Sequence, residues 1–598
     1  LLYYFLILCT FMGLNFNIYN LYEGNTKDLL KLGLIGSGLL IYFIYTFYQK
    51  SSIISKKKSL KIISLILAFF MIFGNSFMNV GSTALIFKNI GFFLLSFIMY
   101  IGYYYLFLVI ISYLFRFLDK NNFSQTKKEK KDNKFLKEFK KHPFLFSLCF
   151  IIICWLPYII SFYPIILSPD PSFQIKQFFG IRTKYADYAV LLDENVVMTN
   201  HHPVTHTILL GSCLKLGTLI GNDNLGLFCY SLIQIAILAG TLAFTIYYMN
   251  KMQINNKYLI VVLLLYGLIP MFPLYAMSGV KDVLFGAFII LYIIVIHNLI
   301  KTKGINYKWW HYLLIILLLI LICLFRNNGI HVIILSFPFL FFVVKNKWKE
   351  LLLVFFIIIG FNSTFNNVIL PYFKITPGSI REVLSVPFQQ TARYVKYHAD
   401  ELNEEEIAVI DNILGIKDLA QRYDPELADP VKNKFNKYTT DEELKEYFKV
   451  WFKRLINHPG TYIEATMNNV YGFFYPEKIK WYVYYKFDDR ITEDGFNYHY
   501  NSLNNARKVL SSLAVSFPYL PVIGLISNIA FNVWLILILL VYAIYKKMYS
   551  HILILLPALV LILVCVVGPA NTYFRYALPF IFAMPFIIAT FLEKRVDK

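Results

Sequence analysis

Charged residues are scarce in this chain. Only 16% of its 598 residues are Asp, Glu, Lys or Arg, whereas 58% are hydrophobic and 18% are aromatic. A soluble protein of this length needs far more charge to cover its surface, so the composition excludes one. Repeated apolar runs approach the ~20 residues that a helix needs to cross a bilayer. The sequence therefore predicts an all-α polytopic membrane protein.

Cysteine motifs are missing as well. The seven cysteines lie in or beside apolar runs, with no CxxC pair and no Cys/His cluster. This pattern argues against a disulfide framework or a cysteine-ligated zinc site and favours small core side chains. The first apolar run lacks a basic segment and a cleavage motif, so we expect a spanning helix there and not a signal peptide. No internal repeat is apparent.

Basic residues concentrate in the short connections between apolar runs. Lys and Arg number 57 against 36 Asp and Glu, a net charge of +21, and their placement is a topology signal because cytoplasmic loops are enriched in them. The predicted spans are 1–20, 29–48, 60–76, 88–117, 143–167, 225–249, 258–276, 283–300, 309–325, 329–345, 351–370, 521–545, 549–567 and 576–593. The basic connections, predicted to be cytoplasmic, are 50–61, 116–141, 251–257, 301–308, 345–349, 546–547 and 594–598. The other connections, predicted to be external, are 21–28, 77–87, 168–224, 277–282, 326–328, 371–520 and 568–575.

This alternation closes only if residues 206–221 do not cross the membrane. The segment is short, contains Lys215 and alternates small with apolar residues. We therefore expect a re-entrant or interfacial amphipathic helix on the outer face. About fourteen transmembrane helices result, with both termini cytoplasmic.

The same pattern divides the chain into five parts. An N-terminal four-helix transmembrane unit (1–117) is followed by a basic cytoplasmic linker (118–142). A second transmembrane module (143–370) contains the external loop 168–224, an external and mostly helical domain covers 371–520, and three transmembrane helices end the chain (521–598).

The topology, which rests on loop charge alone, gathers the unusual polar residues on the outer face. An external pocket with carboxylates and several cations suits a substrate that carries a phosphate and undergoes a proton transfer, because Arg forks bind phosphate oxygens and a carboxylate can accept a proton. These residues are Asp170, Gln174, His201, His202, His206, Ser278, Lys281, Asp282, Arg326, Asn327, Asn328, Arg381, Gln389, Gln390, Arg393 and Arg575.

Simpler interpretations compete with a site. Asp170 in Asp-Pro-Ser is a good helix-start residue, so a capping role and a catalytic role stand about even and do not exclude each other. His201 and His202 suit backbone hydrogen bonds at the interface, although their pairing in a polar loop favours a site. Metal binding by the two adjacent histidines is disfavoured by their spacing. Lys281 and Asp282 suit a local ion pair.

Two arginines also have an alternative role. Arg326 and Arg575 lie where arginines extend toward lipid phosphates as topology anchors, and this interpretation has about the same weight as phosphate binding.

The order of elements resembles the membrane-embedded C-type glycosyltransferases (the GT-C class), in particular a poorly characterised bacterial branch. The matching parts are a span at 151–167, Asp170 in SPDPSFQ, the segment HHPVTHTILLGSCLKLGTLIG and the next span. The match is best over 143–345. Four spans precede the module, and the external domain comes before the last spans, unlike the usual pattern. The nearest match to the class's second carboxylate is Asp282, beside Lys281.

The resemblance implies a GT-C-like fold and an inverting sugar transfer on the outer face of the bacterial plasma membrane. The donor would be a lipid-phosphate (polyprenyl-phosphate) sugar, and the acceptor a glycan, teichoic acid, lipid or protein. Asp170 would be the general base in the external loop. His201, His202, Gln174, Lys281, Asp282, Arg326, Arg393 and Arg575 would bind substrate, with the donor phosphate held by Lys281, Arg326 or Arg575. No cofactor is assigned, a divalent metal is not favoured, and no nucleic acid is expected.

Other functions remain as alternatives. A lipid or glycan transporter or flippase predicts ionisable residues within spans and repeated interrupted helices, whereas the polar residues here lie at span ends. An O-antigen-type ligase or polymerase would place its key Arg and His residues in a large late external loop, which 371–520 leaves open. A purely structural protein would leave the external charges without a purpose.

Overall fold

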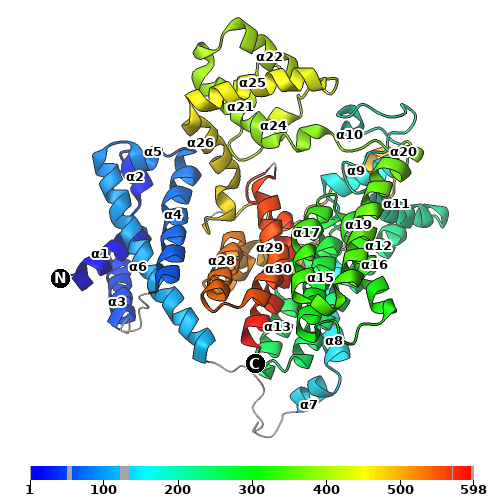
Figure 1. Ribbon diagram of the computed structural model, residues 1–598, viewed down its shortest axis with the longest axis horizontal. Coiled ribbons are helices and arrows are strands. Elements are labelled where there is room, and N and C mark those ends of the chain that lie inside the picture. Colours follow the sequence, from blue (N-terminus) through cyan, green and yellow to red (C-terminus); the bar gives the residue numbers. More distant parts are fainter. Residues whose placement is uncertain (1, 50–56, 121–133, 478, 569, 594–598) are drawn as a thin grey trace.

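The protein is built from helices throughout the part of the chain that the structure describes. The computed structural model describes residues 2–49, 57–120, 134–477, 479–568 and 570–593 (Figure 1). Within these ranges the backbone forms no β-strand, only isolated bridges between single residues. The prediction of an all-helical chain is confirmed. Most of the predicted basic linker lies outside the described residues.

Eight helical stretches among the described residues are long and apolar enough to cross a membrane, and a bent pair of helices brings the number to nine. The eight are α4 (Lys58–Val80), α6 (Ile90–Lys120), α8 (Pro143–Ser161), α12 (Asp223–Lys251), α15 (Asp282–Thr302), the stretch Lys345–Tyr372 that contains α19 (Trp348–Thr364), α29 (Tyr549–Val566) and α30 (Phe574–Leu592). The bent pair is α13 (Asn256–Leu268) with α14 (Met271–Met277), which meet at 49°.

The other five predicted spans also coincide with apolar helices, but these are shorter, at 10–17 residues. They are α1 (Leu2–Asn15), α3 (Gly33–Gln49), α16 (Trp309–Phe325), the stretch Gly329–Val343 made of α17 and α18, and α28 (Ile529–Tyr545). The count of fourteen spans therefore stays a prediction.

Helices α15 and α30 form the centre of the bundle. Most residues of α15 and nearly every residue of α30 are buried. They lie side by side in the same direction, because Asp282 at the start of α15 contacts Arg575 at the start of α30, and His297 near the end of α15 contacts Glu593 just after α30. The first turns of these two central helices carry residues that the sequence places in the site.

The predicted cytoplasmic connections meet one another at the other end of the bundle. Asp119 at the end of α6 pairs with Lys546 after α28, with 2.7 Å between the charged atoms. Lys57 before α4 lies over the ring of Tyr545, 3.9 Å from its centre. A Cβ on Gly304 would lie 2.9 Å from Lys347, so two further basic connections are neighbours. That this end of the bundle is cytoplasmic stays a prediction.

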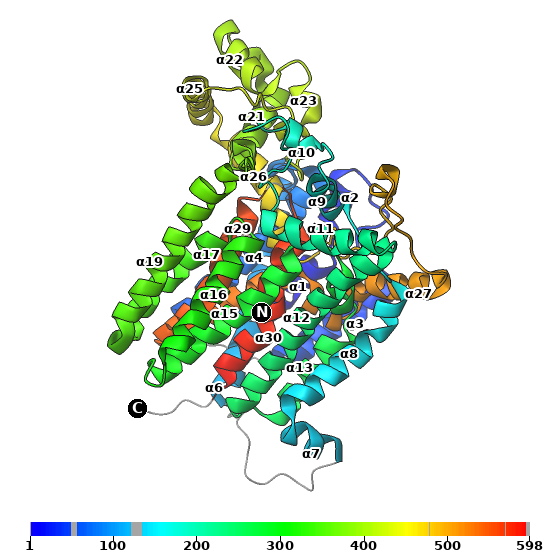
Figure 2. The same ribbon diagram turned by 90° about the vertical axis from the view of Figure 1, so that its right-hand side faces the viewer.

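The predicted external block 371–520 consists of two different parts. Helices α21 to α26 form a small domain above the bundle in Figures 1 and 2, with a hydrophobic core of its own. They are α21 (Ser385–His398), α22 (Glu404–Leu414), α23 (Leu419–Arg422), α24 (Asp429–Lys432), α25 (Asp441–Asn457) and α26 (Pro459–Val470). The chain then returns to the bundle as a mostly irregular segment that ends in α27 (Asn504–Ser516). The block is thus helical mainly in its first part.

The segment predicted to stay out of the membrane forms helix α11 (Val204–Leu219). Its buried face packs against α9 (Pro169–Phe178) and α12, whereas Ile208, Leu216 and Leu219 point outward. The exposed residues of α11 are mostly apolar, with Lys215 and Thr218 among them, and the re-entrant or interfacial placement stays a prediction. Gly217 and Gly226 let the two helices touch, since a Cβ on Gly226 would lie 2.6 Å from the carbonyl oxygen of Cys213.

This close crossing predicts the effect of adding one methyl group. Gly226→Ala should destabilise the protein by about 1–3 kcal/mol, because the methyl group would meet rigid backbone. Gly240→Ala on the same helix is the matched control, since its Cβ meets nothing within 4 Å and alanine favours helix. Thermal unfolding in detergent checks both variants. Equal melting temperatures would contradict the crossing.

Candidate functional site

The candidate site forms where two chain segments meet beside the central helices. The backbone of Ile166 pairs with the loop before α15: its N–H donates to Met277 (2.8 Å), and its carbonyl accepts from Gly279 (3.0 Å). Four residues after this bridge comes Asp170, in the first turn of α9, and the partner segment continues into Lys281 and Asp282. One short backbone pairing therefore brings together two polar clusters that are 111 residues apart in the chain.

Asp170 is held by a cation and a hydroxyl. Arg575 donates a hydrogen bond to Oδ2 of Asp170, the Tyr185 hydroxyl donates to Oδ1 at 3.2 Å, and Nε2 of His202 lies 3.7 Å from Oδ1. The contacts of the carboxylate are thus to side chains that converge on it, which favours a site role over helix capping. Burial raises the pKa of Asp170, but Arg575, His202 and Lys281 together outweigh this effect and hold the pKa well below 3.8. Asp170 is a carboxylate at neutral pH.

A second carboxylate, Asp282, lies directly behind the first. It is fully buried, Arg326 at the end of α16 donates to its Oδ1 at 2.5 Å, and Nε of Arg575 lies 3.6 Å from its Oδ2. Arg575 therefore stands between the two carboxylates. A buried ion pair is costly unless both members are compensated, so these charges stabilise one another.

Lys281 and the two histidines complete the cluster. Nζ of Lys281 lies 2.7 Å from Nδ1 of His202, and burial lowers the pKa of Lys281 to about 8. The ring of His201 stacks on Tyr185 with 4.2 Å between ring centres. Burial lowers the pKa of His201 to about 3 and that of His202 well below 6.5, so both are neutral. Neutral His202 can accept a hydrogen bond from the Lys281 ammonium.

The balance of charge favours an anionic ligand. At neutral pH the cations Lys281, Arg326 and Arg575 face the carboxylates Asp170 and Asp282, which leaves a net charge of +1. Nε of Arg575 and Nε2 of His202 are buried and have no hydrogen-bond partner among the described residues. Buried polar atoms of this kind normally have partners. They are therefore well suited to a polar group that enters the site.

Gln174 belongs to a layer behind the cluster. Its amide donates to Thr207 Oγ1 at 2.9 Å, and its oxygen lies 3.1 Å from Nδ1 of His206. Nε2 of His206 lies 2.7 Å from the Tyr230 hydroxyl. Because its polar atoms already have partners, Gln174 positions α9 against α11 more readily than it binds a substrate.

This buried chain of hydrogen bonds also orders the loop before Lys281. The Tyr230 hydroxyl donates to Gln234 at 2.9 Å, and the Gln234 amide donates to the carbonyls of Ala276 (3.0 Å) and Ser278 (2.6 Å). The loop that carries the site lysine is thus tied to α12.

Arg393 lies in a different group of side chains. Helix α21 holds it against α26, where it pairs with Glu464 at 2.5 Å and donates to the Tyr423 hydroxyl at 3.2 Å. The structure brings together Asp170, His201, His202, Lys281, Asp282, Arg326 and Arg575, but not Arg393. No feature of the sequence distinguishes Arg393 from the residues that the structure brings together.

Two residues of the site have no sequence signal. Tyr185 comes from α10 (Lys184–Asp187) and contacts Asp170 and both histidines. Glu382 lies 3.9 Å from His201 and pairs with Lys432 at 2.5 Å, which links the site to the helical domain. A tyrosine in a polar loop and a glutamate in a mixed-charge segment are too ordinary to be selected without the fold.

A cavity of about 710 Å³ begins at the start of α9. Leu167, Ser168 and Pro169 form one side of it, and the irregular segment 479–490 forms most of the other. Tyr484 of this wall donates a hydrogen bond to the Tyr573 hydroxyl at 3.3 Å, and the Tyr573 ring lies 4.5 Å from the guanidinium of Arg575. The cavity wall therefore contacts Tyr573, which lies beside the charge cluster. This name is used here for Asp170, His201, His202, Lys281, Asp282, Arg326 and Arg575.

The chain belongs to a protein family described as a family of unknown function (DUF6020), which it matches over residues 48–598. No curated protein and no solved structure shows a significant match to it.

The buried ion pair between Asp282 and Arg326 predicts that Asp282 contributes far more to stability than Asp187 does. Asp282→Asn should destabilise the protein by about 3–5 kcal/mol, because it leaves Arg326 buried without a counter-charge. Asp187→Asn is the matched control: Asp187 pairs with Arg182 at 2.8 Å, but both side chains are about half exposed, and such pairs contribute little. Thermal unfolding in detergent should show a large loss for the first variant and no measurable change for the second. Equal small effects would mean that Asp282 reaches solvent.

Proposed function

We propose that this protein is an integral membrane glycosyltransferase of the C-type class. It would transfer a sugar from a lipid-phosphate donor, such as a polyprenyl-phosphate sugar, to an acceptor on the outer face of the plasma membrane, with inversion at the anomeric carbon. The observation that carries the proposal is the position of Asp170: a partly buried, ionised carboxylate lies among an excess of cations at one end of an apolar helix bundle.

The cations suit the phosphate of the donor. Arg326, Arg575 and Lys281 lie at the ends of apolar helices, on the side where the proposal places the outer membrane surface and the phosphate of a lipid-linked donor. An Arg guanidinium forms paired hydrogen bonds with phosphate oxygens. When the bond between the anomeric carbon and the phosphate oxygen breaks, these cations would stabilise the negative charge that develops on the leaving group.

Asp170 would act as the base. The acceptor oxygen attacks the anomeric carbon, the bond to phosphate breaks, and the acceptor proton passes to Asp170. Arg575 pairs with this carboxylate, which makes Asp170 a weak base. A phosphate that takes hydrogen bonds from Arg575 would weaken that pair and raise the basicity of Asp170. Donor binding would thus prepare the base.

The cavity suits the sugar or the acceptor. The wall formed by 479–490 contributes Trp481, Tyr482 and Tyr484, and Asp488 and Arg490 lie on the same wall. Aromatic faces offer apolar surface with polar edges, and the charged groups offer hydrogen bonds to hydroxyls. The cavity is next to the start of α9 and therefore next to the proposed base.

The proposed orientation follows from the clustering of the basic connections at the opposite end of the bundle. That end would be cytoplasmic, together with both termini, and the helical domain with the charge cluster would be external. A transporter is less well supported, because the cluster lies at the ends of the helices. An O-antigen-type ligase is less well supported as well, since Arg393 in the late segment already pairs with Glu464.

Loss of the base predicts loss of transfer. Purified protein in liposomes would be given a panel of polyprenyl-phosphate and polyprenyl-diphosphate sugars, and release of the lipid phosphate would be followed by mass spectrometry. Water can serve as a slow acceptor, so the assay needs no identified acceptor. Asp170→Asn should lower the turnover of an accepted donor by about 10²–10⁴-fold, the usual contribution of a general base.

The control for this experiment is Asp187→Asn, which changes an aspartate of the same loop outside the charge cluster. It should keep wild-type turnover. Absence of turnover for every donor in the wild type, or equal turnover in Asp170→Asn, would overturn the proposal.

The lowered pKa of Lys281 predicts how kcat/KM for the donor depends on pH. Burial lowers the pKa of Lys281 to about 8, so its positive charge is present below that pH and disappears above it. Because kcat/KM reports groups of the free enzyme, kcat/KM for the donor should fall as pH rises through about 8. Lys281→Arg keeps its charge and should move this fall to higher pH, whereas Lys281→Gln should be low at every pH. An unchanged alkaline limb in Lys281→Arg would assign the limb to another group.

A further inference from the structure

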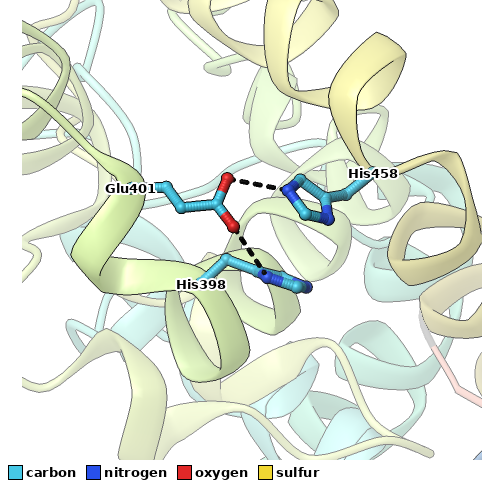
Figure 3. A group of neighbouring side chains, drawn as sticks. All are labelled: His398, Glu401 and His458. Carbon is cyan, nitrogen blue, oxygen red and sulfur yellow. Dashed lines mark hydrogen bonds and ion pairs between the residues drawn. The ribbon is translucent and has the colours of Figure 1, made fainter.

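Two histidines and a glutamate converge in the helical domain, away from the charge cluster. His398 is the last residue of α21, Glu401 ends the short helix that follows it (Ala399–Glu401), and His458 lies at the corner between α25 and α26. Figure 3 shows the carboxylate of Glu401 beside the two imidazole rings, with one oxygen directed at each ring. These three residues, here called the HEH cluster, are joined by no sequence motif, because 57 residues separate Glu401 from His458.

The three side chains offer ligand atoms to one point. Oε1 of Glu401 lies 3.3 Å from Nδ1 of His398, and Oε2 lies 2.7 Å from Nε2 of His458. One ligand atom from each residue lies within 4.8 Å of the other two. The two rings are 4.0 Å apart between centres. Metal ligands at about 2.0–2.2 Å from one ion lie at comparable mutual distances.

Neighbouring residues hold these ligands in place. Nε2 of His398 lies 3.0 Å from the Thr461 hydroxyl, and the Tyr394 hydroxyl donates to Oε2 of Glu401 at 3.3 Å. When Nε2–H of His398 donates to Thr461, the lone pair of Nδ1 faces the Glu401 carboxylate. A cation between them removes the repulsion of these lone pairs. An outer hydrogen bond that orients a histidine in this way is typical of metal sites.

We propose that the HEH cluster binds one Zn²⁺ ion. Two imidazole nitrogens and one carboxylate oxygen form a donor set that zinc prefers, and the fourth position would be taken by water. The three side chains are between about a quarter and just over a third exposed, so an ion can enter from solvent.

The ion would cross-link helices within the helical domain. Its ligands join the end of α21 to the corner of α25 and α26, and these helices share one hydrophobic core. A metal bound only by the folded domain stabilises that domain in proportion to its affinity and concentration. Glu382, which contacts His201, comes shortly before α21 in the chain. The ion would therefore also stabilise the position of Glu382 beside the charge cluster.

The experiment measures metal binding by the full-length chain in detergent, purified with an affinity tag that contains no histidine and treated with EDTA. Zn²⁺ is titrated by calorimetry, and Co²⁺ is used as a visible probe of ligand geometry. We expect one Zn²⁺ per chain, Co²⁺ absorption typical of tetrahedral coordination, and a melting temperature that rises with added Zn²⁺.

Variants locate the site. His398→Ala and His458→Ala should each lower the Zn²⁺ affinity by at least about 100-fold, and Thr461→Val should lower it by about 10–100-fold, the usual effect of losing an outer hydrogen bond. His499→Ala and Glu405→Gln are matched controls, because both residues are exposed and lie outside the cluster. They should bind Zn²⁺ like the wild type. Size-exclusion chromatography confirms that each variant is folded, and Thr461→Val serves if an alanine variant is not.

Three results would overturn the proposal. The first is wild-type protein that binds no Zn²⁺ at micromolar concentrations. The second is affinity unchanged in His398→Ala and His458→Ala, or in Thr461→Val where the alanine variants do not fold. The third is an equal loss of affinity in the control His499→Ala, which would indicate nonspecific binding to surface histidines.

Discussion

The compensation of buried charges at one end of the helix bundle is the constraint on which the rest of this structure depends. Arg575 lies between Asp170 and Asp282, and Arg326 pairs with Asp282 from a third helix. Charges with so little access to water are tolerated only when each has a partner. The first turns of α15 and α30, the end of α16 and the start of α9 must therefore meet, and this requirement sets the register of the central helices.

The same arrangement makes the site responsive to a ligand. Three cations and two carboxylates balance one another incompletely, and within the described part of the chain Nε of Arg575 and Nε2 of His202 have no hydrogen-bond partner. An anion can compete for the arginines without a large rearrangement of the backbone, because α9 is already fixed by Gln174 and His206 and the loop before Lys281 by Gln234. A rigid support with an exchangeable ion pair is the arrangement that the proposed transfer would use.

The helical domain is connected to this site by side chains and not only by the chain. Glu382 links His201 to Lys432, and Glu464 on α26 binds both Arg393 and the backbone of Thr83 in the N-terminal helices. The domain therefore contacts the charge cluster on one side and the N-terminal unit on the other. A metal ion in the HEH cluster would stiffen the part of the domain from which these contacts extend.

The sequence by itself determined that the protein is an all-helical chain with apolar helices, and it located those helices and the polar segments between them. It could do so because hydrophobic length and loop charge are local properties. It also selected Asp170, His202, Lys281, Asp282, Arg326 and Arg575, since ionisable residues beside apolar runs are conspicuous. Only the tertiary structure decided which of these residues meet. It paired Asp282 with Arg326 and not with Lys281, placed Arg393 elsewhere, assigned Gln174 to the supporting layer and added Tyr185 and Glu382. Partners of a charge are set by packing between helices far apart in the chain, and no local pattern carries that information.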